Sequence, residues 1–153
     1  MAPTASIADD RVGRNVVPAA TSEGTYLLAG ALERYVWKVA GVLGVPRDGA
    51  SFEVTDTATA YIALGCRAVA HPDRDVMLVW SATQGWAVSI ETDPAESLIV
   101  LARLSGDIVQ APEVVAGFVA ESMALPGARQ LPAARPALLG WSDLAECMER
   151  YAP

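Results

Sequence analysis

The sequence has few of the residues that bind metals or form disulfides. Its 153 residues include one histidine, His71, and two cysteines, Cys66 and Cys147. Because the cysteines are not in CxxC spacing and only one histidine is present, a zinc site of the usual Cys/His type is close to excluded. We therefore expect no metal and no cofactor. The two cysteines are interpreted as free thiols in a reducing cytosol, with Cys66 half-buried in a strand.

The sequence also has little positive charge. It contains 11 basic and 18 acidic residues, which gives a formal net charge of −7. Contacts to phosphates need a basic surface, so nucleic acid is an unfavourable partner. Residues 25–125 hold six basic and twelve acidic residues, whereas residues 126–153 hold three of each. The sequence therefore predicts an acidic centre beside a segment that carries Arg129 and Arg135.

Long uncharged apolar runs are missing. The longest comparable run, Leu98–Ala102, is far shorter than the roughly 18 residues that a membrane span needs. The first 20 residues contain Asp9 and Asp10 and have no apolar core of a secretory signal. We therefore expect a cytoplasmic protein that makes no membrane contact.

The patterned part of the chain begins with a helix. Apolar residues recur at spacings of three and four over residues 26–43, which is typical of one helix face. Gly44 and Pro46 are expected to end this helix. The apolar period then changes to two and predicts four antiparallel strands joined as a meander. The expected strands lie near residues 52–55, 58–66, 76–80 and 86–91.

Two helices are expected after these strands. Asp93, Pro94 and Glu96 match a cap, a first helical residue and a capping-box glutamate, and so favour a helix that ends at Gly106. A second helix is expected to begin at Pro112.

Together these patterns predict an α+β fold. It has an N-terminal helix, a four-stranded antiparallel meander sheet, and two helices packed on one sheet face, plus a short C-terminal helix. The expected organisation is a disordered leader over residues 1–22, a single α+β domain over 23–125, an Ala/Pro/Arg-rich linker over 126–140, and a short C-terminal helix within 141–153.

The densest group of functional side chains is the segment HPDRD, which we interpret as a polar turn. In an extended conformation His71, Asp73 and Asp75 would project to one side, and an imidazole with two carboxylates can bind a divalent metal or form an acid/base pair. The alternative is a β-turn that Pro72 and Asp73 shape, in which Arg74 pairs with a neighbouring carboxylate.

Four further residues are candidates for ligand or partner contact. Asp56 lies among threonines and, with Tyr61, can contact a polar ligand, or it can simply form an Asx-type turn. Trp80 and Trp86 flank the expected tight turn and can form a peptide-binding platform or pack across the strands in the core. No catalytic residue is assigned, because the sequence has no phosphate loop, nucleophile elbow or HExxH motif.

Several motifs occur together in the centre of the chain. They are Tyr35-Val36, Gly44-Val45-Pro46, TDTATAYIAL (55–64), HPDRDVMLVW (71–80), GW (85–86) and SLIVLARLSGDIVQAPEVVAGFV (97–119). Over about residues 32–119 the sequence resembles an uncharacterised actinobacterial domain-of-unknown-function family, most specifically in HPDRDVMLVW. The resemblance implies a cytoplasmic actinobacterial protein and supplies no catalytic role.

The function we expect is that of a small acidic binding module that acts through protein–protein contacts, as an adaptor, chaperone-like or inhibitor-like protein and not as an enzyme. One form of this contact is a homodimer through the uncovered sheet face or an edge strand. Two alternatives stay open. One is a small enzyme, or a metal- or ligand-binding protein, that uses His71–Asp75 with Asp56 and Tyr61. The other is a regulator linked to nucleic acid through the segment that carries Arg129 and Arg135.

Overall fold

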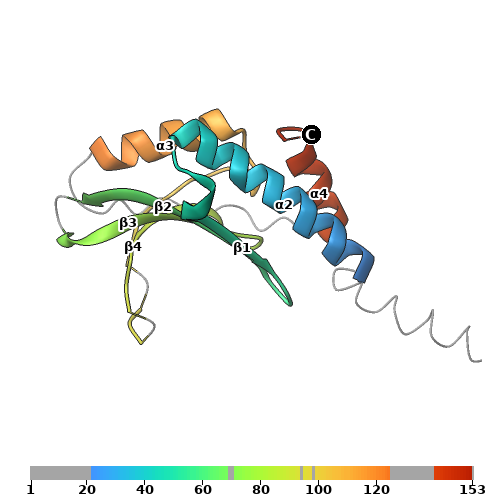
Figure 1. Cartoon of the computed structure of the whole chain (residues 1–153), viewed down its shortest axis with the longest axis horizontal. Coiled ribbons are helices and arrows are strands. Elements are labelled where there is room, and N and C mark those ends of the chain that lie inside the picture. Colours follow the sequence, from blue (N-terminus) through green and yellow to red (C-terminus); the bar gives the residue numbers. More distant parts are fainter. Residues whose placement is uncertain (1–21, 69–70, 94, 98, 125–139, 153) are drawn as a thin grey trace, which may run out of the picture.

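The computed structural model describes residues 22–68, 71–93, 95–97, 99–124 and 140–152. These residues form one antiparallel sheet and three α-helices, which confirms the α+β class (Figure 1). In chain order the elements are α2 (Ser22–Leu43), the 3₁₀ turn η2 (Arg47–Gly49), β1 (Ala50–Val54), β2 (Ala58–Ala68), β3 (His71–Ser81), β4 (Gly85–Ile90), β5 (Ile99–Arg103), α3 (Pro112–Ala124) and α4 (Trp141–Glu149). Residues 1–21 of the expected leader (1–22) and residues 126–139 of the expected linker (126–140) lie outside the described residues.

The sheet has five strands in the order β1-β2-β3-β4-β5, and each strand pairs antiparallel with its neighbour in sequence. The expected meander is therefore correct, but the expected number of four strands is wrong. The connection between β3 and β4 is as tight as predicted. Gly85 has φ of +73° there, a conformation that glycine adopts without steric cost.

The fifth strand replaces the helix that the sequence predicted after Asp93. The backbone N–H of Glu96 donates to the Asp93 carbonyl (2.9 Å), so a turn does form at the expected cap. The chain then continues as β5 and pairs with β4, with a register shift between Val88 and Ser89. The β-branched Ile99 and Val100 suit a strand, and pairing satisfies the backbone groups along the edge of β4. A long-range pairing has thus overridden a local capping signal.

The segment HPDRD is also not the turn that the sequence predicted. It is the beginning of β3, which starts at His71 and runs to Ser81. Its pairing with β2 is irregular, with register shifts on both sides of the Arg67–Asp75 pair. The two strands run antiparallel, and residues 69–70 between them lie outside the described residues.

All three described helices lie on one face of the sheet (Figure 1). The longest, α2, ends where expected, because Gly44 takes the left-handed conformation with φ of +76°. The helix α4 packs beside α2, and Arg34 of α2 lies 3.7 Å from Glu149 of α4. The core between the helices and the sheet includes the side chains of Trp80 and Trp86.

A hydrogen-bond network around the Tyr35 hydroxyl joins this core to the segment between β5 and α3. The hydroxyl accepts from Trp86 Nε1 (3.0 Å) and from the backbone N–H of Gln110 (3.1 Å), and it donates to the Gln110 carbonyl. Trp80 Nε1 donates to the Ile108 carbonyl at 2.9 Å. The two tryptophans and the tyrosine thereby satisfy buried polar groups from three parts of the chain.

We expect the substitution Tyr35→Phe to destabilise the fold by about 2–4 kcal/mol, because it leaves the Trp86 Nε1–H and the Gln110 N–H without their acceptor. Urea denaturation of the full chain measures this loss. The matched control is Tyr151→Phe, since the Tyr151 ring packs on Tyr35 at a centroid distance of 6.4 Å. A loss below about 0.5 kcal/mol in Tyr35→Phe would contradict the assigned role.

The same hydroxyl predicts a pH dependence of stability at high pH. Burial raises the pKa of Tyr35 from 10.0 to about 12. Between pH 10 and pH 12 the unfolded chain has lost the phenolic proton of Tyr35, while the folded chain keeps it. The free energy of unfolding is therefore undiminished below pH 10 and falls towards pH 12, by up to about 2–3 kcal/mol from this group. Denaturation series at pH 9, 10 and 11 should show a steeper fall for the wild type than for Tyr35→Phe. Equal slopes would contradict the prediction.

Candidate binding surface on the uncovered sheet face

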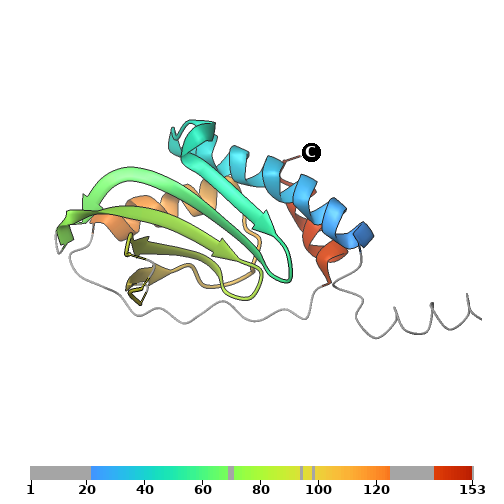
Figure 2. The ribbon, with the colours of Figure 1, turned by 60° about the horizontal axis from the view of Figure 1, so that its bottom comes forward.

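The second face of the sheet is not covered by any described helix, and it is concave (Figure 2). Side chains alternate between the two faces along each strand. In β3, Val76, Leu78 and Trp80 are buried in the core, so Met77 and Val79 lie on the opposite face. The strand register places one row of side chains across the uncovered face, and we call it the central row. It consists of Ser51, Tyr61, Val79, Ala87 and Arg103.

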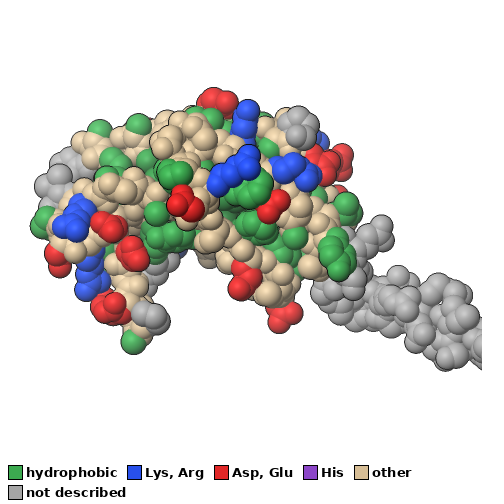
Figure 3. All heavy atoms as spheres, in the orientation of Figure 1, with side chains coloured by type: hydrophobic (Ala, Val, Ile, Leu, Met, Phe, Trp, Pro, Cys, Tyr) green, Lys and Arg blue, Asp and Glu red, His purple; other side chains and the backbone are tan. Residues whose placement is uncertain are grey.

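A cavity of about 680 Å³ lies on this face along the central row. Figure 3 shows the molecule hollowed on its lower side, between two projecting lobes. The cavity size is within the range of about 300–1,000 Å³ that is usual for ligand sites. We call this cavity the groove. Its lining includes residues of the central row, together with Glu53, Thr59, Ser81, Gln84 and Val100.

The two ends of the groove carry opposite charges. Glu53 comes from β1 at one edge of the sheet, and Arg103 comes from β5 at the other. The Arg103 guanidinium donates to Gln84 Oε1 at 3.0 Å. Neither Glu53 nor Arg103 takes part in the ion pairs found between described residues. The groove therefore offers one anionic and one cationic group that an incoming molecule can pair with.

The middle of the groove is uncharged and mixes hydroxyl with apolar side chains. Tyr61 lies there, half-buried. Burial, followed by the Glu91 and Asp75 carboxylates, raises the pKa of Tyr61. The phenol therefore keeps its proton at neutral pH and can donate a hydrogen bond.

Two candidate residues of the HPDRD segment, Arg74 and Asp75, form ion pairs at the far end of β2 and β3. The Arg67 guanidinium lies 3.3 Å from Asp75 and also donates to the Pro72 carbonyl. Arg74 binds both carboxylate oxygens of Glu96, at 2.7 and 3.3 Å, and this hydrogen bond lowers the pKa of Glu96. The expected pairing of Arg74 with a nearby carboxylate is thus observed. His71 is half-buried and Asp73 is exposed.

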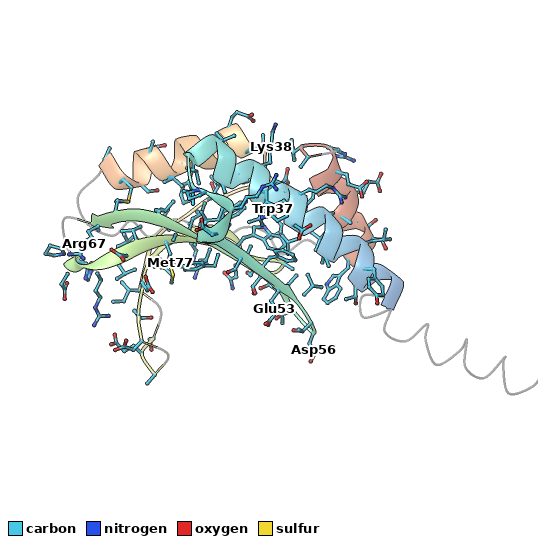
Figure 4. All side chains as sticks on the ribbon, in the orientation of Figure 1. Trp37, Lys38, Glu53, Asp56, Arg67 and Met77 are labelled. Carbon is cyan, nitrogen blue, oxygen red and sulfur yellow. The ribbon has the colours of Figure 1, made fainter. Side chains whose placement is uncertain are left out.

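The structure does not bring the candidate residues together into one site. Asp56 is at the turn between β1 and β2, while His71 pairs with Ala68 at the opposite end of the β2–β3 ladder. Figure 4 shows Asp56 and Arg67 at opposite ends of the sheet. Within the part of the chain that the structure describes, no three His, Cys, Asp or Glu side chains are grouped so that they could hold a metal ion.

The two tryptophan candidates are core residues. Trp80 and Trp86 face each other across β3 and β4, and each is 1% exposed. The structure therefore agrees with the alternative in which the two tryptophans pack across the strands in the core. Trp37 on α2 is half-buried, and the Arg47 guanidinium lies 4.2 Å from the centre of its ring.

Cys66 differs from its expected half-buried state, because it is exposed in β2. Partial desolvation and the Asp75 carboxylate raise the pKa of its thiol. The group is thus not activated as a thiolate nucleophile. Cys147 is also a free thiol.

Sequence reasoning found Tyr61 but missed Glu53, Val79 and Arg103 as groove residues. The apolar period of two near residues 52–55 puts Glu53 on the face opposite Phe52, and this was the available signal. Arg103 had no such signal, because the pattern around it favoured a helix instead of β5.

None of the helices in the described part of the chain combines the length and the apolar character that a membrane crossing requires.

A buried hydroxyl on the uncovered face gives a stability prediction. Ser89 is 0% exposed, and its Oγ has no hydrogen-bond partner among the described residues. We expect Ser89→Ala to stabilise the fold by about 1–2 kcal/mol, because it removes an unsatisfied buried polar group. Ser81→Ala is the control, since the Ser81 hydroxyl accepts from the Gln84 N–H. Thermal denaturation that shows Ser89→Ala to be less stable than the wild type would contradict this prediction.

Comparisons with known proteins agree with the resemblance seen in the central motifs. A search of curated proteins and a search of solved structures each returned no match. A family model described as a family of unknown function, DUF6292, matches residues 35–121. This match covers more than half of the chain, from within α2 to within α3. The chain therefore belongs to the DUF6292 family of unknown function.

Proposed function

We propose that this protein is a small acidic binding module that acts through protein–protein contacts, and that the groove is its binding surface. The observation that carries the proposal is the concave sheet face, which no described helix covers, while the opposite face is packed under α2, α3 and α4 (Figures 1 and 2). An adaptor, chaperone-like or inhibitor-like role is consistent with such a surface. We further propose that the protein is cytoplasmic and of actinobacterial origin, on the strength of its free thiols and its central motifs.

The composition of the groove supports this proposal. Apolar side chains such as Val79 and Val100 line the groove. Binding is stabilised when a partner removes their apolar surface from water. Glu53 and Arg103 at the ends supply polar contacts that can fix the register of a partner.

The alternative of a site at His71–Asp75 has less support. Arg74 and Asp75 are already paired with Glu96 and Arg67, and Asp56 is at the other end of the hairpin. The alternative of nucleic-acid regulation depends on Arg129 and Arg135, which lie outside the described residues, so it stays a prediction.

The proposal is tested by affinity capture from lysate of the source cells with three forms of the full chain. They are the wild type, Val79→Glu in the groove, and Val42→Glu on α2. Val42 is 42% exposed, so it supplies a matched substitution on the helix side. We expect Val79→Glu to recover at least tenfold less of any partner than the wild type, because it buries a charge against the partner. Val42→Glu should recover the wild-type amount.

Circular dichroism of each variant, together with a milder variant, Tyr61→Ala, separates loss of binding from loss of fold. A partner that Val79→Glu and Tyr61→Ala still recover in full would contradict the groove as the binding surface. Recovery of no partner by the wild type would contradict the binding function itself.

A further inference from the structure

We infer that the occupant of the groove is a short extended segment of a partner protein that crosses the strands, with a basic group at the Glu53 end and an acidic group at the Arg103 end. This inference rests on the proposed function and names the chemistry of the partner.

The charges at the two ends of the groove favour a partner segment with the opposite charges. Glu53 and Arg103 lie on the two edge strands of the sheet, and both line the groove. Neither has an opposite charge paired with it among the described residues. The Arg103 side chain is held in place by its hydrogen bond to Gln84, so it loses less conformational freedom when it pairs with a carboxylate. The floor of the groove between Glu53 and Arg103 is uncharged. A partner with a positive charge at one end and a negative charge at the other therefore matches the charges of the groove.

The width of the sheet sets the length of the segment that spans the groove. Four inter-strand spacings separate β1 from β5, and at about 4.8 Å each they span about 19 Å along the sheet. The straight-line distance is shorter, because the face is concave (Figure 2). An extended chain advances about 3.3 Å per residue. Two charged residues with about four residues between them therefore reach from one end of the groove to the other.

The hydroxyl groups on the floor of the groove favour an extended segment over a helix. Ser51, Thr59 and Tyr61 line the groove and can hydrogen-bond to amide groups. An extended segment presents its backbone N–H and C=O groups for such bonds, whereas a helix has satisfied its own internally. Apolar side chains of the segment can lie on Val79 and Val100 between these contacts.

The shape of the face argues against a second copy of this chain packed face to face. Two concave surfaces meet at their rims and leave a void between them, whereas stable interfaces are packed as densely as protein interiors. A nucleic-acid occupant would bring phosphates close to Glu53, and this repulsion disfavours it.

The experiment uses three phage-displayed hexapeptide libraries with four randomised inner positions. The fixed ends are lysine and glutamate in the first library, two lysines in the second, and two glutamates in the third. Each library is panned against the full-length wild type, Arg103→Glu and Glu53→Lys. Lys38→Glu on α2 and Glu146→Lys on α4 are controls that change the net charge by the same amount. Figure 4 places Lys38 and Glu53 on opposite sides of the molecule.

We expect the wild type to enrich the lysine–glutamate library three- to tenfold over the other two. Arg103→Glu should instead prefer the two-lysine library, and Glu53→Lys the two-glutamate library. Both controls should keep the wild-type preference.

Three outcomes would overturn the inference. They are a library preference that is the same in all five proteins, enrichment of no library by the wild type, and a wild-type dimer that Arg103→Glu and Val79→Glu convert to a monomer in light scattering. The last outcome would assign the groove to a second copy. Capture of a partner that depends on Val79 would leave the proposed function standing in the first two cases, so the two failures can be told apart.

Discussion

The Tyr35 hydroxyl is the constraint on which the arrangement of this domain depends. It is a single buried group on α2 that bonds to the indole of Trp86 on β4 and to both backbone polar groups of Gln110. The Trp86 indole is buried and the Gln110 backbone groups are partly buried, so removing their partner costs more than the net gain of one hydrogen bond. The helix, the sheet and the segment that leads from β5 to α3 are therefore held in one relative position.

The direction of the two buried tryptophans accounts for the face on which the described helices lie. Trp80 and Trp86 both point to the helix side, where they supply much of the buried apolar volume and their ring nitrogens find backbone or tyrosine oxygens. The other face receives small and polar residues such as Ser51, Thr59 and Ala87. Nothing comparable anchors a described helix there, and the curvature of the sheet makes that face a groove, with Glu53 and Arg103 at its two ends.

Much of the fold could be predicted from local sequence patterns, whereas the groove depends mostly on which strands pair with each other. The apolar spacing before Gly44 predicted α2. The alternation of apolar residues and the tight turn at Gly85 predicted the meander. Both signals are local, because they come from residues that are close in sequence. The strand β5 was missed because Asp93 and Glu96 carry a genuine capping pattern that only pairing with β4 overrides. That error also concealed Arg103. Residues His71–Asp75 were candidates because several functional side chains follow one another in the sequence. Side chains that are close in sequence do not necessarily converge in space.

The central claim is that binding takes place on the concave face and not on the helices or at the beginning of β3. It is tested most directly by nuclear magnetic resonance of the ¹⁵N-labelled full chain, titrated with a recovered partner. We expect the backbone amide shifts to concentrate in the central row, at residues such as Tyr61, Val79 and Arg103. Shifts that concentrate on α2, α3 and α4, or on residues 71–75, would contradict it.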